Sequence, residues 1–178
     1  MYGKKSKLIV KDNALINASY NLDLTEQRLI LLAIVEAREN GQGINANDPL
    51  TVHAESYAAQ FNVHRNSAYE ALRNACLRLK RREFSYQELT KKGNVHQKIT
   101  GWVSEVGYVE AEARVTLIFS PAVVPMITAL EKQFTSYELE QVSALTSPYS
   151  VRLYELLIAW RSTGKPPLFE LDKLRHLL

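Results

Sequence analysis

The chain has 178 residues and a mildly basic balance, with 22 lysines and arginines against 19 aspartates and glutamates. Its composition, 46% hydrophobic and 23% charged, is typical of a globular protein rather than a disordered or fibrous one. No apolar run approaches the ~18 residues of a membrane-spanning helix, and no signal-peptide core follows the basic N-terminus. The single cysteine, Cys76, excludes an internal disulfide. We expect a soluble, cytoplasmic protein that does not contact a membrane.

Charge is unevenly distributed along the chain. Between residues 65 and 98 lie nine lysines and arginines and only three glutamates. Between residues 104 and 140 the balance reverses, with six glutamates against two cations. A basic block beside an acidic one indicates that one surface faces a polyanion while another makes a different contact. The alternative is that the basic block is simply a solvated helix face.

The first strongly predicted element is a helix over about residues 24–39. Asp23 followed three residues later by Glu26 resembles a capping box at its start, and Asn40-Gly41 ends it. A connector rich in glycine, asparagine and aspartate then leads to a short predicted strand at 50–53.

Two helices, over residues 54–61 and about 65–81, have the spacing of a helix-turn-helix. Ala58 and Ala59 supply the small residue that crossing helices need, and Asn62 tolerates the positive φ of a tight turn. His64 stands where serine or threonine usually caps the second helix. Arginine and lysine on the exposed face of this helix would mostly grip DNA phosphates. The candidate DNA-contacting residues are Arg65, Asn66, Arg73, Lys80, Arg81, Arg82, Lys91 and Lys92.

A β-region follows the two helices. Its predicted strands, which we expect to form one three-stranded antiparallel meander, are residues 84–89, 95–108 and 113–119. Together with the helix-turn-helix, this predicts an α+β fold of the winged-helix class, with Lys91-Lys92-Gly93-Asn94 as the tip of the wing. Further helices are expected over about residues 120–132, 138–145 and 148–161.

The meander is too apolar for a fully solvated sheet. Its apolar side chains either pack under the helices of the same chain or pair with a second copy to form a two-fold dimer. The candidate dimer-interface residues are Ile99, Trp102, Val103, Val106, Tyr108, Val115 and Leu117.

The order of elements begins again near residue 147. A helix, a glycine, a Pro-Leu strand and a short helix occur in that order over residues 24–61 and again over residues 148–178. We therefore expect a first winged-helix domain at 1–146 and the incomplete beginning of a second at 147–178. The alternative is a chance similarity between two amphipathic helices.

Three segments, Asn13–Ile16, Leu24–Leu29 and above all Ser147–Leu157 with its Tyr-x-x-Arg-Leu-Tyr-Glu stretch, resemble the replication initiator (Rep) proteins of iteron plasmids. The likeness is closest to the Rep proteins of small circular plasmid-like DNAs. It implies a first winged helix that dimerises and contacts the DNA backbone, and a second that reads iteron repeats in the major groove. The implied partners are double-stranded DNA at origin iterons and at an operator inverted repeat, a second copy, and host replication proteins.

Motifs of other chemistry are missing from the sequence, which contains no Walker A loop, GxGxxG, HExxH or GxSxG pattern. The four histidines show no metal spacing, and Cys76 near a helix seam favours buried packing over reactivity. We expect a non-enzymatic protein without catalytic residues, metal or cofactor. Two other functions stay open: a repressor whose first winged helix reads operator bases, and a module that only binds proteins.

Overall fold

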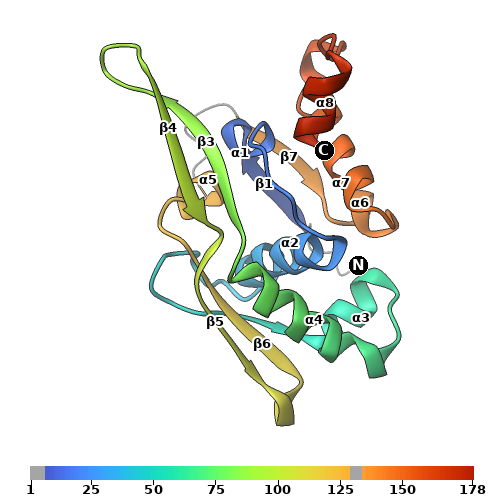
Figure 1. The fold of residues 1–178 in the computed structure, drawn as a ribbon. Helices are drawn as coiled ribbons and strands as arrows, with labels where there is room; N and C mark the ends of the chain where they lie inside the picture. The colour runs from blue at the N-terminus through green and yellow to red at the C-terminus, as the bar shows by residue number, and fades with distance from the viewer. Residues whose placement is uncertain (1–6, 129–133) are drawn as a thin grey trace.

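The computed structural model describes residues 7–128 and 134–178. Its strands form three small antiparallel sheets, with the orders β1–β7, β2–β6–β5 and β3–β4 (Figure 1). Helix α2 (Leu24–Glu39) runs through the middle of the molecule and packs against α4, β2 and β1. The seven apolar residues from Leu29 to Val35 are all buried, so this helix is the centre of the hydrophobic core. In the described residues no helix is both long and apolar enough to cross a bilayer.

The predicted capping box at the start of α2 is confirmed. The Asp23 carboxylate accepts the Glu26 backbone N–H at 2.8 Å, and the Glu26 carboxylate accepts the Asp23 backbone N–H at 2.7 Å. At the other end Asn40 caps the helix and Gly41 takes a φ of +67°. The helix therefore has the bounds that its sequence signals predict.

The helix-turn-helix is formed by α3 (Ala54–Phe61) and α4 (Arg65–Leu79). Asn62 adopts the left-handed conformation with a φ of 52°, as the sequence predicts. His64 is the N-cap of α4, and its Nδ1 accepts the backbone N–H of Asn66 at 3.3 Å. A histidine therefore does here what serine or threonine does in most helices.

The prediction of one three-stranded meander is wrong. Strand β2 (Leu50–His53) pairs with β6 (Arg114–Phe119), which pairs with β5 (Val103–Val109). Strands β3 (Glu83–Leu89) and β4 (Val95–Gly101) form a separate hairpin, which we call the ribbon. The chain passes from one sheet to the other at Trp102. The buried Trp102 ring packs against two other rings there, with its centroid 4.9 Å from that of Tyr20 and 4.6 Å from that of Phe84.

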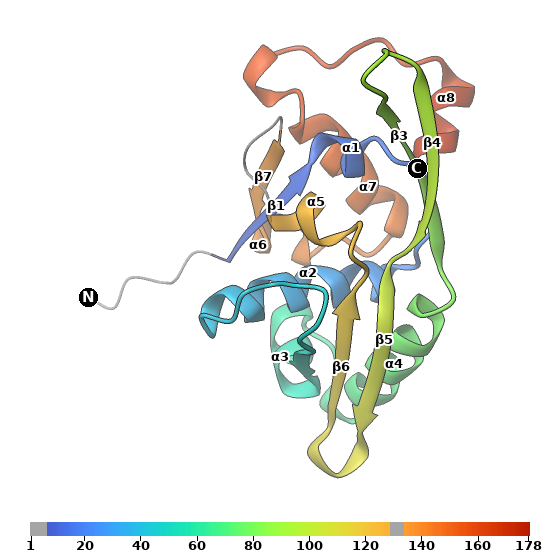
Figure 2. The same ribbon diagram turned by 90° about the vertical axis from the view of Figure 1, so that its left-hand side faces the viewer.

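This arrangement moves the wing of the winged helix. The hairpin beside α4 is β5–β6, whose tip is the short helix η1 (Glu110–Glu112), whereas the ribbon is inserted between α4 and β5. The Lys91–Asn94 turn is therefore the tip of the ribbon and not of the wing. The two tips point to opposite ends of the molecule (Figures 1 and 2).

The N-terminal part of the described chain adds elements that the sequence did not indicate. Strand β1 (Leu8–Asp12) pairs with β7 (Phe134–Glu138), and α1 (Asn13–Ile16) follows it. Between β6 and β7 the described helix is α5 (Val124–Thr128), shorter than predicted because residues 121–123 form a turn. The end of the predicted helix, residues 129–132, lies outside the described residues.

The C-terminal part contains α6 (Glu140–Ser143), α7 (Pro148–Ile158), the short helix η2 (Arg161–Thr163) and α8 (Leu171–Leu177). The predicted strand that begins at Pro167 is wrong: residues 167–170 form no strand, and Leu168 is fully exposed. The helices of the expected second repeat are present, and its strand is not.

Candidate nucleic-acid interface

The exposed surface of the wing is rich in glutamate, whereas α4 carries one glutamate, Glu70. Glu105, Glu110 and Glu112 are all exposed on the wing. Near them, Arg114 forms an ion pair with Glu112, and Arg65 of α4 forms one with Glu55 at 2.9 Å. Because a duplex is uniformly negative, carboxylates on a wing oppose its close approach. The wing of this winged helix is therefore poorly suited to DNA.

Two of the candidate arginines are engaged within the protein. The Arg82 Nε lies 3.1 Å from the carboxylate of Glu26, which is completely buried. Arg73 is partly buried and its guanidinium stacks on the ring of Tyr108, 4.8 Å from the centroid. Binding of a phosphate by Arg82 would have to compete with a buried carboxylate. The main role of Arg82 is therefore to neutralise the buried Glu26 carboxylate.

The ribbon offers a different electrostatic surface. At its tip Gly93 has a φ of +80° and the Thr90 hydroxyl accepts the Asn94 N–H at 3.1 Å, which holds Lys91 and Lys92 outward on a tight turn. At its base, after α4, lie Lys80 and Arg81. Within the described chain these four exposed cations form no ion pair and no side-chain hydrogen bond: Lys80, Arg81, Lys91 and Lys92.

The ribbon is long enough to reach along a nucleic acid. Each strand has seven residues, so at ~3.3 Å per residue the ribbon extends by roughly 23 Å. Its far end stands clear of the helices in Figure 1. A two-stranded ribbon also has the width that a DNA major groove admits. The free cations of the DNA-binding set thus lie at the tip and base of the ribbon, and the paired ones lie beside the wing or at the start of α2.

Four of the seven candidate dimer residues lie in the core of their own chain. Trp102, Val103, Val115 and Leu117 expose between 0% and 4% of their surface, so packing under the helices of the same chain accounts for them. Ile99 and Tyr108 stay exposed, and Val106 is partly buried. Of the two readings that the sequence left open for these four residues, packing within the same chain is the one the structure shows, with α4 over β5 and β6.

The structure adds two exposed apolar residues that the sequence did not single out. In the register of the ribbon, Leu89 lies opposite Val95, and Ile99 lies on the same face of β4 as Val95, four residues away. Their exposed fractions are 74% for Leu89, 61% for Val95 and 72% for Ile99. The signal in the sequence was their period-two spacing, which becomes informative once the hairpin turn is known.

Crossed helices α3 and α4, packed on the sheet β2–β6–β5 with its β5–β6 wing, define a winged-helix domain of the helix-turn-helix class. Residues 8–158 match the family described as "Initiator Replication protein, WH1", and the chain belongs to this family. The predicted fold class and the predicted family are therefore both confirmed.

Two curated relatives come from Escherichia coli. One, named "Replication initiation protein", is 28% identical over 179 residues, which covers 97% of this chain and 55% of that protein. The other, an uncharacterised 27.6 kDa protein, is 26% identical over 172 residues, which covers 92% of this chain and 71% of that protein. The chain thus spans only part of the length of both relatives.

Two solved structures are similar to this chain. The WH1 domain of MSBI1.176, a replication protein isolated from a multiple sclerosis patient, is 64% identical with a TM-score of 0.59, over 68% of this chain and 92% of that chain. The Pi initiator protein, solved in complex with iteron DNA, is 22% identical with a TM-score of 0.77, over 98% of this chain and 73% of that chain. The second likeness shows a shared fold.

Proposed function

We propose that this chain is part of a plasmid DNA replication initiator, in which it dimerises and binds the backbone of double-stranded DNA without sequence preference. The longer protein would recognise the origin iterons and the operator inverted repeat. Family membership and the likeness to an E. coli replication initiation protein support this function. The role is non-enzymatic and cytoplasmic, and host replication proteins are further partners.

The observation that carries the proposal is the set of four unpaired cations at the tip and base of the ribbon. All four are exposed and free of internal carboxylates, and Lys91 and Lys92 stand at the tip of the projecting element, whereas Arg65, Arg82 and Arg114 are held in ion pairs. Lysine and arginine that neutralise phosphates release counterions, so binding should weaken steeply with salt. The ribbon, rather than α4 with its wing, is then the element that contacts DNA.

The test compares two double variants that remove the same charge from opposite ends of the molecule. Lys91→Ala with Lys92→Ala should reduce the slope of log affinity against log salt by ~1.8, since each phosphate contact contributes ~0.9. Arg65→Ala with Arg114→Ala should leave that slope unchanged. Fluorescence anisotropy with iteron and random duplexes over a salt series measures both.

The outcomes separate the functions that the sequence left open. Equal affinity for iteron and random duplexes supports backbone contact, and strong preference for one sequence supports a repressor that reads bases. A loss of slope only in the Arg65 and Arg114 variant would move the contact to α4 and the wing. Absence of binding even at low salt would leave a protein-interaction module, which the acidic wing also suits.

For the dimer, we propose that the second copy covers the exposed apolar face of the ribbon formed by Leu89, Val95 and Ile99. Three large apolar side chains exposed by 61% to 74% on one short hairpin are unusual for a surface that only meets water. The family to which the chain belongs and the resemblance to dimerising initiators support a copy of this chain as the partner.

A further inference from the structure

Five polar side chains from separate segments meet in the interior between β1, β7 and α7. Lys11 lies on β1, Tyr20 lies in the segment before α2, Tyr137 lies on β7, and Arg152 and Glu155 lie on α7. None of them exposes more than 8% of its surface. Three of the five carry a full charge, so the interior holds two cations and one anion that need partners.

Glu155 is the centre of this cluster. Its Oε1 accepts the Tyr137 hydroxyl at 2.6 Å and also forms an ion pair with the Lys11 ammonium. Its Oε2 accepts Arg152 Nη1 at 3.1 Å and the Tyr20 hydroxyl at 3.4 Å. Burial alone would raise the pKa of Glu155, but the charges of Lys11 and Arg152 hold that pKa below its usual value. The carboxylate is thus charged and fully hydrogen-bonded.

Arg152 connects the cluster to the ends of two short helices. Its Nη2 donates to the carbonyls of Ile16 at 3.0 Å and Ala18 at 3.1 Å, at the end of α1. The same nitrogen donates to the Leu177 carbonyl at 3.1 Å, at the end of α8. The last carbonyls of a helix lack intrahelical donors, so a guanidinium is well suited to them. Its planar face also lies over the Tyr20 ring, 4.0 Å from the centroid.

Helix α8 has few other attachments to the body of the molecule. In the described chain its polar links to the rest are the Arg152 contacts and one hydrogen bond from the Ser19 hydroxyl to the His176 carbonyl, at 3.2 Å. Its apolar links are Leu177, which packs in a small buried cluster with Ile16 and Leu156, and the partly buried Leu174, which packs against that cluster. The first residue of α8, Leu171, is 61% exposed.

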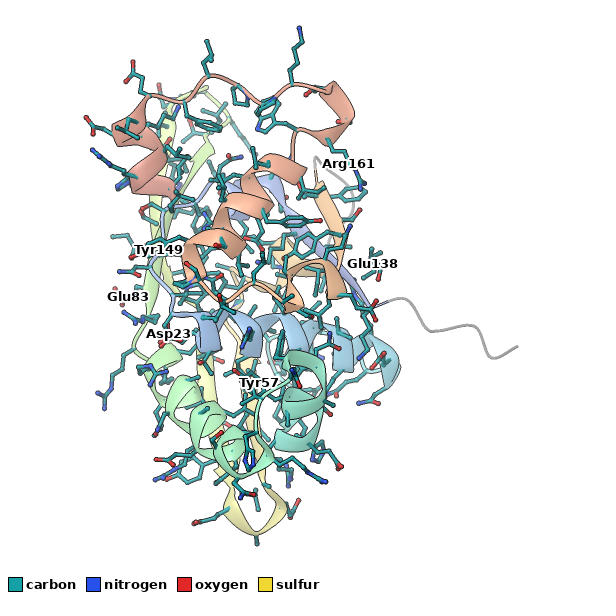
Figure 3. All side chains as sticks on the ribbon, turned by 90° about the vertical axis from the view of Figure 1, so that its right-hand side faces the viewer. Asp23, Tyr57, Glu83, Glu138, Tyr149 and Arg161 are labelled. Carbon is teal, nitrogen blue, oxygen red and sulfur yellow. The ribbon has the colours of Figure 1, made fainter. Side chains whose placement is uncertain are left out.

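We infer that Arg152 and Glu155 form a buried latch that holds α8 against the β1–α1 layer and so sets the direction in which the chain leaves the winged helix. Figure 3 shows α7 running between Tyr149 and Arg161, with α2 on one side and α8 on the other. The purpose of the latch rests on the proposed function. The latch would keep the segment that follows α7 in a defined position relative to the ribbon, the element for which we propose DNA contact.

The latch is distinct from an ordinary core contact because one side chain serves three separate chain segments. If Arg152 is lost, the end of α1 and the end of α8 lose their donor together, while α3, α4 and the wing keep all their contacts. Lysine keeps the charge beside Glu155 but has a single nitrogen, so it cannot reproduce the planar fork that reaches these carbonyls.

Hydrogen–deuterium exchange on the whole chain, read peptide by peptide, tests this inference. Arg152→Lys should speed amide exchange at least tenfold in residues 171–178 and in residues 13–20, with exchange in α4 and the wing unchanged. Arg175→Lys, on the exposed side of α8 where Arg175 pairs with Asp172, is the matched control and should change nothing.

Two results would overturn the latch: unchanged protection of α8 in Arg152→Lys, or an equal rise in exchange throughout the chain. If Arg152→Lys fails to fold, Tyr20→Phe is the second variant. It removes only the hydroxyl that accepts a hydrogen bond from Arg152 Nη1 at 2.6 Å, and it should speed exchange in the same residues by a smaller factor. A uniform or absent response in Tyr20→Phe would then refute it. Because no DNA is present, the result does not depend on whether the ribbon binds the backbone.

Discussion

Glu26 joins a local motif to a distant one. Its carboxylate completes the capping box of α2 through Oε2, while Oε1 lies 3.1 Å from Arg82 and 3.5 Å from Arg78. The Asp-x-x-Glu spacing predicts the capping box. The ion pair with Arg82 joins residues 56 positions apart, so no local pattern predicts it.

Glu26→Gln should therefore destabilise the fold by about 2 kcal/mol, because it keeps the cap but leaves two guanidinium groups without their buried anion. The estimate is below that for a fully buried pair, since both arginines are partly exposed. Urea denaturation measures the change. Glu70→Gln, on the exposed face of α4, is the control and should stay within about 0.5 kcal/mol. Equal losses in the two variants would contradict a structural role for Glu26.

The reactivity of Cys76 is set by its burial. Its side chain is completely buried on α4, as the sequence pattern predicts, and burial raises the pKa of its thiol to about 11. The folded thiol therefore stays protonated and shielded at neutral pH. Unfolded cysteine loses its proton first as pH rises, so this group lowers stability between about pH 9 and pH 11.

At the scale of elements, the turn between α3 and α4 depends on one backbone conformation. Asn62 has a φ of 52°, which asparagine and glycine accept more easily than residues with a plain Cβ. Its backbone N–H bonds to the Ala58 carbonyl and closes the turn. The crossing angle of the two helices is therefore tied to this residue.

Asn62→Ala should cost about 1 kcal/mol, which is a fall of roughly 2–4 °C in Tm for a chain of this size. Asn62→Gly should lie close to the wild type, since glycine needs no steric relief at positive φ. Thermal denaturation followed by circular dichroism compares the two variants. If alanine is tolerated as well as glycine, the left-handed turn is not what holds α3 against α4.

The β-region shows why elements can be predicted while their pairing cannot. The strand positions at 84–89 and 113–119 agree with β3 and β6, but the predicted strand at 95–108 divides at Trp102 into two strands of different sheets. Alternation along a strand reports which faces are apolar, and it contains no information about the neighbouring strand. The division into two strands falls at Trp102, where its ring packs against Tyr20 and Phe84.

At the scale of the whole molecule, the negative charge of the wing and the free positive charge of the ribbon are separated. The exposed glutamates of the wing and the free lysines of the ribbon lie at opposite ends (Figures 1 and 2). The ribbon also carries the exposed apolar face proposed for a second copy. DNA binding and dimerisation are both proposed for this one element, which has cations at its tip and base and apolar side chains along its length.

Ile99→Asp should weaken self-association at least tenfold, because it places a carboxylate within the proposed apolar contact. Leu168→Asp changes a fully exposed leucine in the segment before α8 and should have no effect. Sedimentation velocity over micromolar concentrations measures both. A wild-type chain that stays monomeric at every concentration, or an Ile99 variant that dimerises normally, would remove the ribbon as the dimer surface.

The amino-acid sequence by itself determined the features that depend on neighbours along the chain: the bounds of α2, the αL turn at Asn62, the helix-turn-helix and the family. Only the tertiary structure decided which basic residues are free, which strand pairs with which, and that Arg152 reaches Ile16, Ala18 and Leu177. The physical reason is distance along the chain. Caps and turns are satisfied within a few residues, whereas the ion pair of Glu26 with Arg82 and the pairing of β2 with β6 join residues more than fifty positions apart.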